Sequence, residues 1–156
     1  GIAPETVNAQ LRFRFAVGNS YFMEIAKLRA FRLLWANVLT TFGLGEPAPI
    51  PPVEAYTASA ALVEDPYLNM IRLTTQAMSV VIGGSDLLFL PPADLLSPGK
   101  SPAFMRRISR NVQHLLKMES HFDAVRDPAG GSYYVEKLTE AVAERAWSAF
   151  QKSAGR

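Results

Sequence analysis

Apolar residues along the chain recur with two different periods. Between residues 22 and 42 the period is near 3.6, which predicts a long helix with one apolar face. The apolar residues that define this face stand at positions 28, 31, 35, 38, 39 and 42. Residues 11–17 instead place Phe13, Phe15 and Val17 at alternate positions, which predicts a strand leading into the helix.

Prolines and glycines mark the boundaries of a second unit. Residues 43–52 contain two glycines and four prolines, which end the first helix and predict a surface loop. Residues 53–57 form a second predicted strand. The next helix begins at Asp65-Pro66, where an N-cap residue precedes a proline at the first helical position, and it ends at the glycine pair 83–84.

A third unit and a final helix complete the pattern. Residues 87–90 are an apolar run of strand length, and Ser101-Pro102 starts a helix that is predicted to end near Ser120. The last helix covers about residues 135–152 and follows the glycine pair 130–131. The residues predicted to face the core are Phe104, Ile108, Val112 and Leu115 in the third helix and Leu138, Val142, Ala146 and Ala149 in the last.

This order of elements predicts an α/β fold in which parallel strands are joined by right-handed crossovers. A closed eight-stranded barrel needs about 250 residues. The 156 residues of this chain therefore predict a partial (β/α)8 TIM-type barrel of about three strand-helix units plus a C-terminal helix. Arg14 lies inside the first predicted strand, where a buried parallel strand disfavours charge.

An incomplete barrel is expected to leave apolar surface and strand edges uncovered. The residues predicted to face the barrel interior are Phe13, Phe15, Val53, Leu88 and Leu90. We therefore expect the isolated chain to associate with itself, or to be a segment of a longer polypeptide that closes the barrel.

Composition narrows the function classes. The 16 basic and 14 acidic side chains give a net charge of +2, which is too balanced to indicate nucleic-acid binding. No cysteine is present, which excludes a disulfide framework and a thiolate metal site. No apolar run is long enough to cross a bilayer, and no signal peptide precedes the first strand. We expect a cytoplasmic protein without membrane contact.

Other candidates for site chemistry are few. The two histidines, His114 and His121, have no partner at the spacing of a zinc or iron site, so both are expected to be structural. No Gly-x-Ser-x-Gly motif occurs, which argues against a serine nucleophile. One face of the third predicted helix is basic and is expected to be solvated. It carries Arg106, Arg107, Arg110 and Lys117.

Several segments resemble a known family when they are taken in order. They are residues 21–36, residues 65–69 with Arg72, residues 108–111 and residues 127–139. Over nearly the whole chain they resemble the C-terminal part of the substrate-binding barrel of the methylmalonyl-CoA mutase family. Members of this family rearrange the carbon skeleton of a coenzyme A thioester with adenosylcobalamin, which a separate domain holds. The resemblance implies that residues 1–156 are one barrel segment without a cobalamin-binding domain.

The resemblance also identifies positions where catalytic members contact their ligands. An arginine and a serine reach coenzyme A, a histidine and a glutamine belong to a His-Ser-Gln-Thr-Ser-Gly-Trp motif, a serine follows the second helix, and a glutamate holds the adenosyl ribose. The corresponding residues here are Gln10, Arg12, Glu54, Tyr56, Leu87 and Leu95. Because these side chains do not supply the same contacts, the resemblance implies no catalytic residue in this chain.

Many bacterial members of the family pair a catalytic large subunit with a smaller subunit that has lost its active site, and the chain resembles the smaller one. The resemblance implies that the large subunit is its partner and that this chain alone binds no adenosylcobalamin. Glu24, Lys27 and Arg29 are then expected to pair on the surface of the first helix. Asp127, with the glycine pair 130–131, is expected to form a turn.

Two alternatives remain open at this point. The chain could be a working acyl-CoA mutase with a different substrate, in which Arg12 and Tyr56 serve as new ligand groups. It could also be a stand-alone interaction module that docks through the basic helix around residues 106–117.

Overall fold

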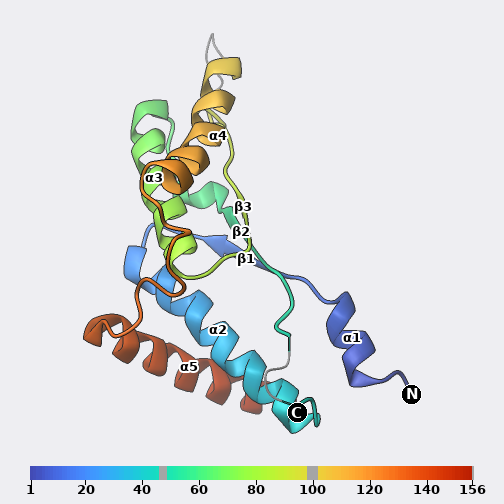
Figure 1. Cartoon of the computed structure of the whole chain (residues 1–156). Helices are drawn as coiled ribbons and strands as arrows, with labels where there is room; N and C mark the ends of the chain where they lie inside the picture. Colours follow the sequence, from blue (N-terminus) through green and yellow to red (C-terminus); the bar gives the residue numbers. More distant parts are fainter. Residues whose placement is uncertain (46–48, 98–101, 156) are drawn as a thin grey trace.

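A three-stranded parallel sheet lies at the centre of the structure, with helices packed on one of its faces (Figure 1). The computed structural model describes residues 1–45, 49–97 and 102–155. Part of the predicted loop at residues 43–52 and the predicted cap at Ser101 lie outside these residues. In the described part of the chain, no helix combines the length and the apolar character needed to cross a membrane.

The predicted strands and helices are confirmed. The elements in chain order are α1 (Pro4–Gln10), β1 (Phe13–Val17), α2 (Tyr21–Thr41), β2 (Val53–Thr57), a 3-10 turn (Ser59–Ala61), α3 (Pro66–Ile82), β3 (Leu87–Phe89), α4 (Pro102–Met118) and α5 (Tyr133–Ala154). Helices α2 and α5 lie side by side, as do α3 and α4 (Figure 1). The fold is α/β and is consistent with a partial barrel.

Helix boundaries follow local chemistry. The Asp65 carboxylate accepts hydrogen bonds from the backbone amides of Tyr67 and Leu68, which confirms the predicted N-cap of α3. Gly84, with φ +84°, lies just beyond the end of this helix. Helix α1 and the 3-10 turn were not predicted, since each is too short to show a hydrophobic period.

The strands pair in the order β1-β2-β3 with a defined register. Phe13 lies beside Val53, and Glu54 of β2 lies between Arg14 of β1 and Leu87 of β3. Because successive side chains of a strand point to opposite faces, this register sends one set of residues toward the helices and the other set to the open face of the sheet.

The prediction of which residues face the barrel interior was wrong. Instead, these residues pack under the helices: the Phe13 ring lies 4.6 Å from the rings of both Phe31 and Trp35 of α2, and Val53 is fully buried. The residues that were assigned to the wrong face are Phe13, Phe15, Val53, Leu88 and Leu90. Alternation along a strand defines two faces, but it does not indicate which of them the helices will cover.

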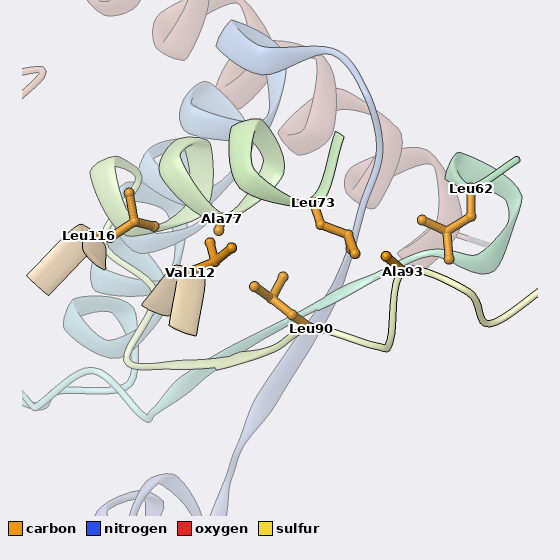
Figure 2. Packing of buried hydrophobic residues seen from close by; sticks show 7 residues of the cluster. All are labelled: Leu62, Leu73, Ala77, Leu90, Ala93, Val112 and Leu116. Carbon is orange, nitrogen blue, oxygen red and sulfur yellow. The ribbon is translucent and has the colours of Figure 1, made fainter. Parts of the chain in front are cut away.

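A core cluster fills the space between α3, α4 and the segment that follows β3. Figure 2 shows its side chains converging from these elements. The cluster consists of Leu62, Leu73, Ala77, Leu90, Ala93, Val112 and Leu116. In α4 the prediction of Val112 as a core residue is confirmed, Ile108 is half-buried, and Phe104 and Leu115 are exposed. The buried side of α4 instead runs through Ser109, Val112 and Leu116. Ser109 can be buried because its hydroxyl donates to the Pro91 carbonyl at 2.7 Å.

Helix α5 also buries a different side from the one predicted. Val135, Thr139 and Ala143 are buried, whereas Ala146 and Ala149 are exposed, and Leu138 and Val142 are half-buried. Thr139 enters the packed side because its hydroxyl donates to the Val135 carbonyl of its own helix at 2.7 Å. The pattern of apolar residues along the sequence therefore does not identify a buried threonine.

Asn69 connects three segments around α3. Its side chain is fully buried and donates to the carbonyls of Val63 and Ala93 at 2.7 and 2.8 Å, while its carbonyl oxygen accepts from the Val63 amide at 2.9 Å. The segments before α3 and after β3 are therefore held by one side chain. Buried backbone groups require such partners, because an unpaired one is costly.

We expect Asn69→Ala to lower the free energy of unfolding by about 3 kcal/mol, because it leaves buried backbone groups without partners. Urea denaturation followed by circular dichroism measures the change. Asn111→Ala removes an exposed asparagine from α4 and is the matched control, with an expected change below about 0.5 kcal/mol. Equal effects of the two substitutions would contradict the structural role of Asn69.

We also expect the isolated chain to self-associate. The open face of the sheet exposes Tyr56, Leu87 and Phe89, and β1 and β3 are the edges of the described sheet. In analytical ultracentrifugation the average mass should rise with concentration. A monomer that is insensitive to dilution and binds no hydrophobic dye would refute this expectation.

Candidate functional site

The open face of the sheet is hollowed. A depression of about 640 Å³ runs across β1, β2 and β3. It is lined by Arg14, Glu54, Ala55, Tyr56, Leu87, Leu88 and Phe89. One part of its wall is charged and the rest is largely apolar, with the Phe89 side chain 67% exposed.

The charged wall is an ion-paired cluster. Arg14 donates from Nε and Nη2 to Glu54 Oε2 at 3.0 and 2.8 Å, and Arg12 Nη1 lies 3.7 Å from Glu54 Oε1. The pairing follows from the register, which places Arg14 directly beside Glu54 on the same face. Both oxygens of Glu54 therefore already face guanidinium groups of this chain. The position of Arg14 in a strand is explained, because this face is not covered by helices.

The structure brings together only some of the six predicted site residues. Glu54, Tyr56 and Leu87 line the depression, and Arg12 reaches it through its contact with Glu54. The remaining two, Gln10 and Leu95, are exposed and are not among the lining residues. Gln10 ends α1, and Leu95 lies in the segment after β3.

Sequence reasoning missed Arg14 and Phe89 as residues of this face. Arg14 stands two positions after Arg12, and Phe89 stands two positions after Leu87. Since a strand has a period of two, each shares a face with a residue that was singled out. The two-residue spacing within each strand could therefore have identified both residues from the sequence.

The histidines lie away from the depression. His114 is exposed on α4, and His121 follows that helix with a positive φ of 52°. Neither lines the open face. Within the residues that the structure describes, no group of three His, Cys, Asp or Glu side chains is arranged to hold a metal ion.

The basic face of α4 is exposed, as predicted. Arg106 and Arg110 border a smaller hollow of about 290 Å³ beside the end of β3, and the Arg107 guanidinium lies 5.4 Å from the centre of the Phe104 ring. Lys117 pairs with Asp123 at 3.7 Å. All four basic side chains of this face are solvent-exposed.

The expectation that Arg29 pairs on a helix surface was wrong. Its side chain is only 14% exposed and bridges two distant carboxylates, Asp127 in the segment before α5 and Glu136 in the first turn of α5 at 2.7 Å. The Glu136 carboxylate also accepts from the Gly131 amide at 3.1 Å. This backbone hydrogen bond, followed by the Arg29 contact, lowers the pKa of Glu136.

The turn predicted around Asp127 is confirmed. Asp127 and Gly131 have positive φ angles of 49° and 79°, and a Cβ atom at Gly130 would lie 3.1 Å from Asp127 backbone and side-chain oxygens. The turn therefore favours glycine at 130 and 131 for two different reasons, close approach and backbone conformation.

Glu24 is likewise buried and is not a surface group. It accepts a hydrogen bond from the Gly18 amide at 3.1 Å and pairs with Lys27, as predicted for these two neighbours. Lys27 in turn donates to the Ala16 carbonyl at 2.7 Å. The start of α2 is thus tied to the end of β1.

Comparison with known proteins gives one consistent family. A family model described as methylmalonyl-CoA mutase matches residues 1–155. The chain is 41% identical over 153 residues to the methylmalonyl-CoA mutase small subunit of Porphyromonas gingivalis, which covers 96% of this chain and 25% of that protein.

Two further relatives agree. The small subunit of Streptomyces virginiae is 42% identical over 153 residues, covering 97% of this chain and 24% of that protein. The methylmalonyl-CoA mutase of Cereibacter sphaeroides is 38% identical over 156 residues, covering 97% and 22%. The chain spans about a quarter of the length of the curated relatives it matches.

Replacing Glu136 with Gln should weaken the acid sensitivity of the fold. Because the folded-state pKa of Glu136 is lowered, its carboxylate stabilises the fold above the ordinary glutamate pKa, and this stabilisation is lost as the pH falls through the folded-state value. Urea denaturation at a series of pH values should show a smaller decline toward acid in Glu136→Gln than in the wild type.

The control for this prediction is Glu144→Gln, which removes one negative charge from an exposed position of the same helix. It should decline toward acid as the wild type does. Indistinguishable pH profiles for the wild type and Glu136→Gln would show that the Glu136 contacts do not contribute to stability.

Proposed function

Since the chain belongs to the methylmalonyl-CoA mutase family, we propose that it forms part of the barrel of an adenosylcobalamin-dependent methylmalonyl-CoA mutase and that its own role is structural. The complete enzyme would interconvert methylmalonyl-CoA and succinyl-CoA, an isomerase reaction. This chain would correspond to the non-catalytic small subunit. The two small subunits named above are more similar to it than the Cereibacter sphaeroides mutase is.

One observation carries the structural role. At the position where catalytic members are expected to place a histidine, this chain has Glu54, and its carboxylate is engaged by Arg14 and Arg12. A substrate would have to displace these contacts before it could use any of the three groups. The neighbouring Leu87 and Phe89 offer no hydrogen-bonding side-chain atoms. Among the described residues that line this face, the Tyr56 hydroxyl is the remaining uncharged polar side-chain group, and by itself it is a poor substitute for the several groups that orient a thioester and stabilise developing charge.

The described residues also do not fit adenosylcobalamin. Leu95, at the position of the ribose-binding glutamate, is an exposed hydrocarbon side chain, and neither histidine lies at the open face. We therefore assign no step of the reaction to this chain. In the proposal the cofactor is held by the large subunit.

The proposed partner is the catalytic large subunit of the mutase. Relatives named as small subunits support this partner, and a shared assembly would give this chain a role without a working site. We further propose a cytoplasmic location, which the absence of cysteine fits. The balanced charge gives no support to nucleic-acid binding.

The two alternatives are less well supported. An active mutase would need Arg12 and Tyr56 as ligand groups, yet the Arg12 guanidinium lies against Glu54. A stand-alone module would need only the α4 face, whereas the family match extends across residues 1–155. The structural role in a mutase accounts for both the match and the paired face.

Isothermal titration tests the proposal. Neither methylmalonyl-CoA nor adenosylcobalamin should give a binding heat above the heat of dilution with the 156-residue chain. The expected reason is that residues at the ligand positions are replaced by other side chains or are engaged in ion pairs. A catalytic mutase large subunit titrated under the same conditions is the positive control. Micromolar binding of either ligand by this chain would overturn the non-catalytic role and favour the active alternative.

A further inference from the structure

Helix α5 stands outside the two main core clusters. One of these joins α3 and α4, and the other lies between the sheet, α2 and α3. Neither contains a described residue of α5. The helix contributes only Val135 to a smaller third cluster with Ile25 and Ala129, and its packing partner is α2 (Figure 1).

The buried side of α5 is also short. It is limited to Val135, Thr139 and Ala143, and no described residue from 144 onward is buried. Trp147 and Phe150 instead contact each other with ring centres 5.4 Å apart and remain partly exposed. The second half of the helix thus adds no residue to the core, although most of the stability of a protein helix comes from packing of its apolar face.

The polar contacts of Arg29 hold this helix in place. Arg29 of α2 reaches both Asp127 and Glu136, so one largely buried side chain holds the start of α5 and the segment that precedes it. Residues 119–132 contain no described helix or strand. Phe122 packs against the cluster between α3 and α4, and Asp123 pairs with Lys117 of α4, so residues 124–132 are the part of this connection that can move with α5.

We propose that α5, together with residues 124–132, is a hinged arm that is latched by Arg29 and opens from α2 while the sheet, α3 and α4 stay folded. Opening uncovers the apolar side of α2 around Ile25. Proteins open in such contiguous units when a segment has few buried apolar residues, and in α5 such residues are confined to the first half of the helix. The inference concerns the mobility of this chain and does not depend on the proposed function.

Native-state hydrogen exchange of the full 156-residue chain, read by mass spectrometry, tests the arm. In the wild type, amides of α5 should be less protected than amides of α3. Arg29→Gln should speed exchange in α5 and residues 124–132 by about tenfold or more, and should leave α3 and β2 within about twofold of the wild type.

Lys137→Gln is the matched control. It removes a cationic side chain from α5 that pairs with the neighbouring Glu140 on the exposed side of the helix. Because such exposed pairs contribute little, exchange in α5 should stay within about twofold of the wild type. If Arg29→Gln does not fold, Glu136→Gln replaces it, since this variant removes one carboxylate of the latch and keeps Asp127.

Three outcomes would overturn the proposal. Equal protection of α5 and α3 in the wild type would show a single cooperative unit. Uniform acceleration of all amides in the latch variant would show global destabilisation. Unchanged exchange of α5 in that variant would show that Arg29 does not latch the arm.

Discussion

The register of the parallel sheet is the constraint on which the rest of this structure depends. With Phe13 beside Val53, the aromatic side chains of β1 meet α2, and the charged and exposed residues of all three strands collect on the opposite face. A shift by one residue would exchange these two sets completely. The ion-paired cluster of Arg14 and Glu54 and the depression beside it are therefore direct products of strand pairing.

Much of the architecture was predictable because its signals are local. The Asp65-Pro66 start and the Gly83-Gly84 end of α3 act within a few residues of the helix boundary, and the strand runs are short and clear. The buried sides of α4 and α5 were not predictable in the same way. Ser109 and Thr139 are buried because their hydroxyls bond to nearby carbonyls, and a count of apolar residues passes over them.

The candidate site was likewise predictable only in part. Resemblance to the family selected Glu54, Tyr56 and Leu87, and the fold brings these three into one depression. Resemblance alone did not indicate that Glu54 would be paired with Arg14, since that contact joins residues 40 positions apart through the sheet register. The long reach of Arg29 to Glu136 escaped prediction for the same reason, because it spans 107 positions.

The two kinds of polar contact in this chain differ in what they can do. The groups that hold the scaffold, Asn69, Glu24 and Arg29, are largely buried and bind across segments, where the loss of a partner is costly. The Arg14–Glu54 pair lies on an open face with the arginine 70% exposed, where an ion pair contributes only about 0–1 kcal/mol. The fold therefore does not require that pair for stability. Its main effect is to engage the Glu54 carboxylate within the chain, which is consistent with the structural role proposed above.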